Sequence, residues 1–225
     1  MIINNTYFKN ELYIPHAKPG LNDEITSVQS DVDSYIDKYS RECLLKSLGY
    51  QLFQEFTAEL DPSEANGLKP TADAKWDELL NGTSYTDSNG VAKVWRGIRF
   101  KSSLLDGAEY DTSFLAGYVY FYFQKNGFDT TTNVGTVKES AVNAEFSSPA
   151  PKAVSAWNDF IELAQGKTNN PNVWIAWNGT LAVDYYGDGF DIFLYQFIND
   201  SNELIADRYE GFNPYCWKPM TQFGI

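Results

Sequence analysis

Histidine and cysteine are almost absent from this chain of 225 residues. It contains one histidine, His16, and two cysteines, Cys43 and Cys216. A zinc centre or a Ser-His-Asp triad would therefore depend on His16 alone, in a proline-punctuated segment, although catalytic groups must be held in fixed geometry. Two cysteines cannot form a disulfide framework, and Cys43 falls on a predicted apolar helix face, as buried free thiols do. This scarcity disfavours triad enzymes, zinc proteins and disulfide-rich folds.

Long apolar runs and phosphate-binding loops are missing as well. No stretch approaches the 18 apolar residues that suggest a membrane-spanning helix. The first residues, MIINNTYFKNELYIPHAKPG, lack the basic start and apolar run of a signal peptide. The segment LLDGAEYDTSFLAG has neither the glycine spacing nor the following Lys-Ser/Thr of a phosphate loop. We therefore expect a protein with no membrane contact and no cofactor.

Positive charge is also scarce. The chain has 17 Lys and Arg against 30 Asp and Glu, and its formal net charge is −13. A field of that sign repels phosphate at long range, so general nucleic-acid binding is disfavoured. The one local basic cluster, near a predicted hairpin, is more typical of a solvated surface than of a nucleic-acid patch. Its members are Lys93, Arg96, Arg99 and Lys101.

Carboxylates cluster once, in the sequence VDYYGDGFD, which contains Asp184, Asp188 and Asp191. Oxygen ligands this close could hold Ca²⁺, but the spacing is not that of a calcium-binding loop. Helix capping and solvation are the favoured interpretation. A hydrolase that uses acids in 184–191 stays open as an alternative, and no other catalytic motif is present.

Apolar and aromatic residues are abundant, at 43% and 16% of the chain, enough for one compact core. Apolar residues at three- and four-residue steps predict helices over 23–39 and 43–56, a short helix around Trp76, and helices over 111–124, 149–164 and 190–198. Asn89-Gly90 predicts a hairpin over about 84–95. The segment 173–177 could be a strand. Because 111–124 is apolar around most of its circumference, we expect it at the centre, with four of its residues packed on three from other helices. The four are Leu115, Tyr118, Val119 and Tyr122, and the three are Leu48, Leu52 and Trp157.

The predicted fold is mainly α, a small helical bundle with a short β-hairpin insertion and extended N- and C-terminal arms. Residues 1–20 form the N-terminal arm, 21–200 the helical core with a long loop at 128–147, and 201–225 a C-terminal docking arm. Loops of that length are often functional, so we expect an interface or channel contact from Thr130, Thr131, Thr132 and Asn133. The C-terminal arm follows the last predicted helix and carries large apolar residues. These residues predict an interface with a partner. These are Phe212, Tyr215, Trp217, Phe223 and Ile225.

Several of these segments occur in a familiar order. YIDKYSRECLLKSLGYQLFQEF is followed by WDELLNG, FLAGYVYFYF, TTTNVGTVKESAVNAE and PAPKAVSAWNDF, and the chain ends in NPYCWKPMTQFGI. The pattern resembles the head–tail connector (adaptor) family of tailed bacteriophages, in the form found in phages of Bacteroidetes hosts, including crAss-like phages. The resemblance covers about residues 20–165 and the last dozen, and 166–210 has no counterpart in it.

The resemblance implies a structural virion protein of the neck, made in the host cytoplasm and without enzymatic activity. Such proteins form a homo-oligomeric ring, usually of twelve copies, beneath the portal protein, where they join the capsid to further neck or tail proteins. DNA passes through the ring without sequence-specific binding. A second interpretation, suggested by the Trp and Tyr content, is a carbohydrate- or receptor-binding virion module.

Overall fold

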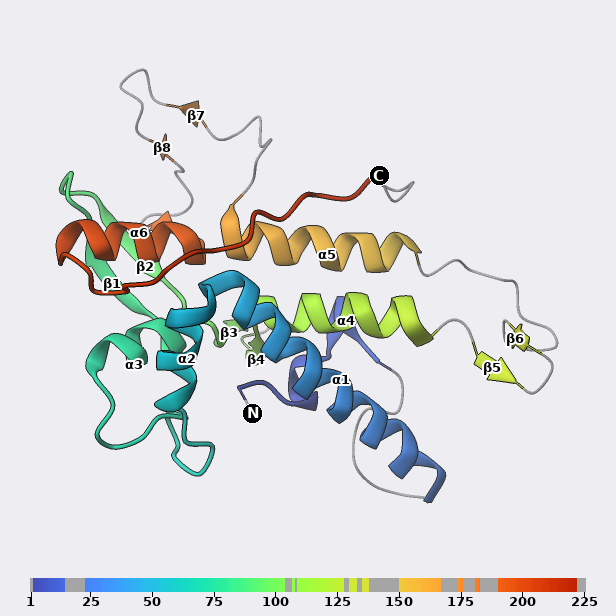
Figure 1. The fold of residues 1–225 in the computed structure, drawn as a ribbon. Helices are drawn as coiled ribbons and strands as arrows, with labels where there is room; N and C mark the ends of the chain where they lie inside the picture. Colours follow the sequence, from blue (N-terminus) through green and yellow to red (C-terminus); the bar gives the residue numbers. More distant parts are fainter. Residues whose placement is uncertain are drawn as a thin grey trace.

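A computed structural model describes residues 2–14, 23–103, 107, 109–127, 130–132, 135–137, 150–166, 174–175, 181–182 and 190–221. Over these residues the chain is mainly helical, with small β-hairpins, which confirms the predicted fold class at this level (Figure 1). Six α-helices lie in the described part of the chain. Among the same residues, no helix has both the length and the apolar character that crossing a bilayer requires.

The first helix, α1, is longer than predicted. It runs without a break from Asp23 to Leu48, so there is no boundary before Cys43. The break comes at Gly49, whose φ is +86°, and α2 follows over Tyr50–Ala58. A Cβ atom at position 49 would lie 2.9 Å from the backbone N and O of Asn213. Gly49 thus has a positive φ and also lies in close contact with a distant segment. Neither requirement can be predicted from the spacing of apolar residues.

Helix α4, Phe114–Gly127, is the central element and packs against both α1 and α5, Ala150–Gln165 (Figure 1). Leu115, Tyr118 and Val119 are fully buried, which confirms the predicted centre. The predicted neighbours Leu48, Leu52 and Trp157 are buried in the same cluster, and Tyr122 packs at its edge. Gly117 permits the close approach of the two helices, because a Cβ there would lie 2.8 Å from the carbonyl oxygen of Ala156.

The predicted start of this helix at Asp111 is wrong. Asp111 belongs to strand β4, Glu109–Thr112, which pairs antiparallel with β3, Phe100–Ser103. The helix begins after Ser113, whose hydroxyl donates to the carbonyl of Ile98 at 2.6 Å and accepts from the backbone N–H of Leu115 at 3.2 Å. The polar strand β4 carries no apolar alternation, which is why the sequence did not reveal it.

The other hairpins are short. The predicted hairpin at 84–95 is present as β1, Thr83–Thr86, paired antiparallel with β2, Ala92–Trp95. Strand β9, Phe190–Asp191, pairs parallel with β2 and makes this a three-stranded sheet. Inside the predicted long loop, β5, Thr130–Thr132, pairs antiparallel with β6, Gly135–Val137. Strands β7, Trp174–Ile175, and β8, Leu181–Ala182, pair likewise.

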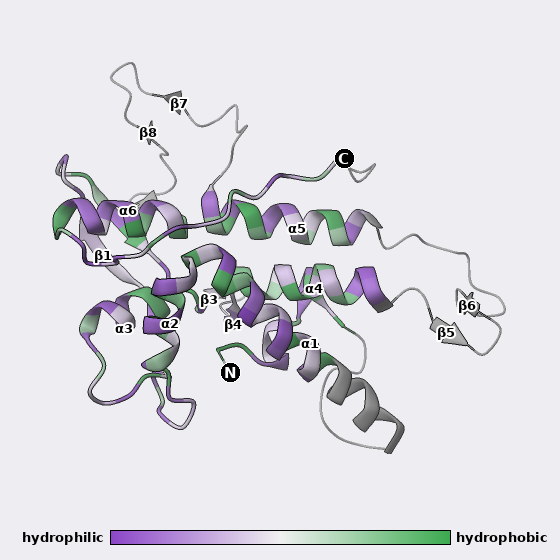
Figure 2. Cartoon of the chain, viewed as in Figure 1, coloured by the Kyte–Doolittle hydropathy of each residue, from purple (hydrophilic) through white to green (hydrophobic). Residues whose placement is uncertain are grey.

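Two further helices flank the three-stranded sheet of β1, β2 and β9. Helix α3, Ala74–Asn81, is capped by the Asp73 side chain and ends at Gly82, whose φ is +92°. Helix α6, Leu194–Leu204, starts later than predicted, because residues 190–191 belong to β9. Gly166 ends α5 with φ +89°. Figure 2 shows hydrophilic and hydrophobic residues alternating along α5 and α6, as expected for helices with one buried face.

The N-terminal segment is not an extended arm over its described part. Residues 2–14 contain two 3₁₀ turns, Asn5–Tyr7 and Asn10–Leu12. Three of its apolar side chains, Ile3, Phe8 and Ile14, are buried in the main core. The segment is also tied to β4 by a 2.6 Å hydrogen bond from the Thr6 hydroxyl to the Asp111 carboxylate. The first residues of the chain thus complete the core.

Replacing Leu115 by alanine should lower the free energy of unfolding by about 2–5 kcal/mol, since it empties a fully buried site at the centre of α4. Leu163, which is exposed on α5, is the matched control, and Leu163→Ala should change stability little. Chemical denaturation of both variants measures the difference. Equal stability losses would contradict the placement of α4 at the centre.

Candidate functional site

The C-terminal segment, residues 205–221, crosses most of the helices in turn and is the candidate functional site (Figure 1). It contacts α3 first, where the Tyr209 hydroxyl donates to the Lys75 carbonyl at 2.7 Å. It then follows the C-terminal end of α1. Here the backbone N–H groups of Asn213 and Tyr215 donate to the carbonyls of Leu48 and Lys46, at 3.1 and 2.7 Å. These carbonyls lie in the last turn of a helix, where no intrahelical donor reaches them.

The rest of the segment lies along α5, where its backbone is held by side-chain amides and an indole. Gln165 bonds both backbone groups of Trp217, its Oε1 accepting at 2.9 Å and its Nε2 donating at 2.7 Å. Asn158 holds Met220 in the same two-way manner. The indole N–H of Trp157 donates to the Lys218 carbonyl at 2.9 Å. Paired bonds of this kind fix the register of an extended segment as a neighbouring strand would.

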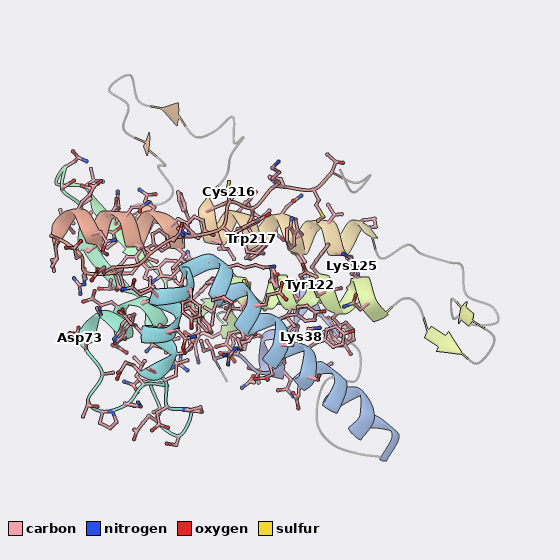
Figure 3. All side chains as sticks on the ribbon, in the orientation of Figure 1. Lys38, Asp73, Tyr122, Lys125, Cys216 and Trp217 are labelled. Atoms are coloured by element: carbon pink, nitrogen blue, oxygen red, sulfur yellow. The ribbon has the colours of Figure 1, made fainter. Side chains whose placement is uncertain are left out.

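Trp217 anchors the segment in an aromatic slot between α1, α4, α5 and α6. Only 4% of its surface is exposed. Its ring meets those of Tyr118, Trp157 and Phe160 at centroid distances of 5.4, 5.6 and 5.0 Å, all edge-on. Its indole N–H donates to the Tyr195 hydroxyl at 3.0 Å, so the one polar atom of the ring is satisfied. Figure 3 labels Trp217 beside exposed Cys216 on this segment.

The predicted interface residues of the C-terminal arm therefore differ in how far they are exposed. Trp217 is part of the chain's own core and is not exposed for a partner, contrary to the prediction. Phe212 is half-buried and packs edge-on against Tyr195. Tyr215 is 58% exposed, as an interface residue requires. Phe223 and Ile225 lie outside the described residues.

A second exposed aromatic residue, Tyr50, lies at the junction of α1 and α2, which the C-terminal segment crosses. Tyr50 is the first residue of α2 and 72% exposed, and it follows the α1 turn to which Tyr215 is bonded. We name this area, formed by Tyr50, Asn213, Tyr215 and Cys216, the tyrosine surface. Exposed aromatic residues are enriched at protein interfaces. Periodicity alone could not have found Tyr50, because it detects the buried stripe of a helix and Tyr50 is exposed.

The second predicted contact, in the loop 128–147, falls mostly outside the described residues. Within it, Thr130, Thr131 and Thr132 form strand β5, with Thr130 opposite Val137 and Thr132 opposite Gly135. Asn133 lies outside the described residues. A hairpin with backbone pairing of its own is a defined unit that can be removed as a whole.

The predicted basic cluster does not form one surface. Lys93 is buried, and its Nζ lies 2.8 Å from carboxylate oxygens of both Asp87 and Asp200. The Tyr85 hydroxyl donates to the same Asp200 oxygen at 2.6 Å. Arg99 instead donates to the Asn81 side chain, and Lys101 pairs with Glu109. The Lys93 cluster fastens the β1–β2 hairpin to α6, and its partners are too far apart in sequence for any local pattern to reveal it.

The charges of this cluster hold one another in place. Burial raises the pKa of Asp87, but hydrogen bonds from Lys93 and from the backbone N–H groups of Val91 and Asn89 outweigh it and leave the pKa below its ordinary value. Burial lowers the pKa of Lys93, and its bonds to Asp200 and Asp87 more than reverse this. Asp87 and Lys93 are therefore both charged at neutral pH.

The remaining candidates for chemistry are separate or undescribed. His16, Asp184 and Asp188 lie outside the described residues, and the structure describes only the strand backbone of Asp191. In the part of the chain that is described, no three His, Cys, Asp or Glu side chains converge as metal ligands would. Cys43 is buried beside Ser47, and desolvation raises the pKa of its thiol. Such a thiol is a weak nucleophile.

No protein-family model matches this chain, and no curated protein or solved structure matches it either.

The two aromatic residues of the C-terminal segment should behave oppositely when truncated. Trp217→Ala should lower the free energy of unfolding by about 3–5 kcal/mol, because it empties the aromatic slot. Tyr215→Ala, the matched control, should leave stability nearly unchanged because its ring is exposed. Thermal melting of both variants measures the difference. An unchanged melting temperature for Trp217→Ala would show that Trp217 does not pack in the core.

Acid should weaken the attachment of the β1–β2 hairpin. The folded pKa of Asp87 is depressed, so its contribution to stability is present at neutral pH and is lost as the pH falls below about 4. Asp87→Asn keeps a side-chain acceptor for the turn but has no charge to lose, so its stability should depend less on pH in this range. Denaturation midpoints measured from pH 7 downward compare the two, and parallel curves would show that the ion pair contributes nothing.

Proposed function

We propose that this protein is a structural component of a tailed-phage virion, a ring-forming connector that joins the portal to the tail. The observation that carries the proposal is the ordered set of sequence motifs from YIDKYSRECLLKSLGYQLFQEF to the NPYCWKPMTQFGI ending. Apart from TTTNVGTVKESAVNAE, which contains β5 and β6, these motifs fall on α1 with α2, on α3, on α4, on α5 and on the C-terminal segment. The resemblance thus involves the segments that pack together in the core.

The tyrosine surface supports assembly with a partner. Tyr50 and Tyr215 expose most of their area although the same segment buries Trp217 nearby. In a ring every copy presents the same surface, and a neighbour that contacts it must do so through a second, different patch. We propose that the outward side of the C-terminal segment makes the contact with the portal or the next copy, while its inward side holds the monomer together.

The charge of the chain fits a channel that releases DNA. With a net charge of −13, the protein repels the phosphate backbone at long range. Lys93, which belonged to the only basic cluster in the sequence, is neutralised by two carboxylates. DNA would therefore pass a ring of this protein without a sequence-specific grip.

The carbohydrate- or receptor-binding alternative drew its support from Trp and Tyr. Four tryptophans have side chains that the structure describes, Trp76, Trp95, Trp157 and Trp217, and all four are buried. Sugar-binding platforms need exposed rings. The core accounts for these residues, so we retain the connector proposal.

The native mass of the purified chain, measured together with a low-resolution image, tests this proposal directly. A closed ring is the expected result, alone or on addition of the portal protein, and a monomer under both conditions would contradict it. Tyr50→Ala with Tyr215→Ala should reduce ring or portal binding while leaving the melting temperature unchanged, since both rings are exposed. Leu204→Ala, an exposed apolar residue elsewhere, on α6, is the matched control.

The β5–β6 hairpin gives an independent test. Deleting Thr130–Val137 removes both strands with the two residues between them and should spare the monomer fold, because β5 and β6 pair with each other. We expect impaired ring formation or genome retention. Full, infectious particles assembled from the deleted chain would show that the hairpin has no such role.

A further inference from the structure

Asparagine followed by glycine occurs five times in this chain, at Asn66, Asn81, Asn89, Asn126 and Asn178. Asparagine is a thermolabile residue, and a following glycine leaves its side chain open to attack by the next backbone nitrogen. The five pairs share the same local chemistry. Asn178 lies outside the described residues, so the structure distinguishes among the other four.

Three of the four are restrained by their surroundings. Asn81 donates to the Asn66 carbonyl and to Asp77, and it accepts from Arg99 at 2.7 Å. A Cβ atom at the following Gly82 would lie 2.5 Å from the backbone of Arg96, so no space exists there for a new ring.

The other two restrained pairs are held by one side-chain bond each. The Asn66 side chain accepts from the Leu68 N–H at 3.2 Å, and the Arg99 guanidinium lies 3.1 Å from a Cβ at the following glycine. Asn126 donates to the Tyr39 hydroxyl at 3.0 Å and lies within α4. In each case the asparagine must break a contact before it can rotate toward the backbone.

Asn89 is different. It is exposed at the tip of the β1–β2 hairpin, and within the described part of the chain no hydrogen bond holds its side-chain amide. Space around the following residue is open as well, since a Cβ at Gly90 would meet nothing within 4 Å. One restraint remains, a 3.0 Å bond from the Gly90 N–H to the Asp87 carbonyl, and Gly67 has its equivalent in a 2.9 Å bond to the Glu64 carbonyl. Because Gly90 and Gly67 both carry this restraint, it gives no difference in reactivity between Asn89 and Asn66.

We propose that Asn89 is the site of spontaneous deamidation among the described Asn-Gly pairs of the folded protein. The Gly90 backbone nitrogen loses its proton to solvent base and attacks Cγ of Asn89. The new N–Cγ bond replaces the Cγ–Nδ2 bond, and ammonia leaves with a proton taken from water. One water molecule then opens the five-membered imide, giving either aspartate or isoaspartate with the backbone routed through Cγ. No oxidant or reductant takes part.

The isoaspartate product would act on the Lys93 cluster. Asp87 Oδ1 accepts from the backbone N–H groups of both Asn89 and Val91, each at 2.9 Å. An extra backbone carbon between residues 89 and 90 shifts these two donors relative to each other, so one carboxylate oxygen can no longer serve both. The Asp87 side chain that pairs with Lys93 is thereby loosened.

Peptide mapping of the folded full-length chain, aged at mildly alkaline pH, tests the site. The expected result is accumulation of aspartyl and isoaspartyl peptides at Asn89 ahead of Asn66, Asn81 and Asn126. A parallel sample aged in denaturant should lose this ranking, because the local sequence is then all that differs. Equal rates at the four sites in the folded chain, or an unreactive Asn89, would overturn the proposal.

The effect on the hairpin is read from melting. Aged wild-type protein should melt at a lower temperature than fresh protein, and aged Asn89→Gln should not, since glutamine forms the corresponding ring far less readily. Ageing that lowers both melting temperatures equally would show that the damage lies elsewhere. Neither result depends on ring formation, so failure here is separate from failure of the connector proposal.

Discussion

The insertion of Trp217 into the aromatic slot is the contact on which the rest of the structure depends. The slot takes one wall from each of α1, α4, α5 and α6, and none of these helices closes it alone. The rings of Tyr118, Trp157 and Phe160 would otherwise face solvent at the point where the helices meet. Burial of one tryptophan contributes the usual few kcal/mol, which is a large share of the net stability of a domain. The C-terminal segment therefore contributes to the core through Trp217.

This arrangement gives the C-terminal segment two different sides. Its inward side carries Trp217 and the backbone groups paired with Gln165 and Asn158. Its exposed side carries Tyr215. The Tyr215 ring meets the Trp217 ring edge-on at a centroid distance of 4.9 Å, so the exposed tyrosine lies at the rim of the slot that Trp217 fills. A partner that docks on the outward side meets a surface whose backbone is already held in place, and so little ordering entropy is lost on binding.

Local sequence patterns predicted the parts of the fold that local forces determine. The apolar faces of α4 and α5 and the Asn-Gly hairpin follow from spacing or from conformational freedom. The rest depends on contacts between residues far apart in the chain. Gly49 is needed because Asn213 approaches it, and Lys93 is buried because Asp200 arrives from α6. Trp217 was expected at a partner interface because apolar residues in a proline-containing tail look the same whether they bind the chain itself or a neighbour.

The position of Trp217 after helices α1 to α6 in the chain has a consequence for biosynthesis. A ribosome makes these helices before it makes Trp217. They therefore emerge with the aromatic slot empty, and its rings stay exposed until the C-terminal segment follows. Completion of the fold is thus tied to synthesis of the C-terminal segment. A truncated product would display an open aromatic groove, which marks it for chaperones or proteases before it could enter an assembly.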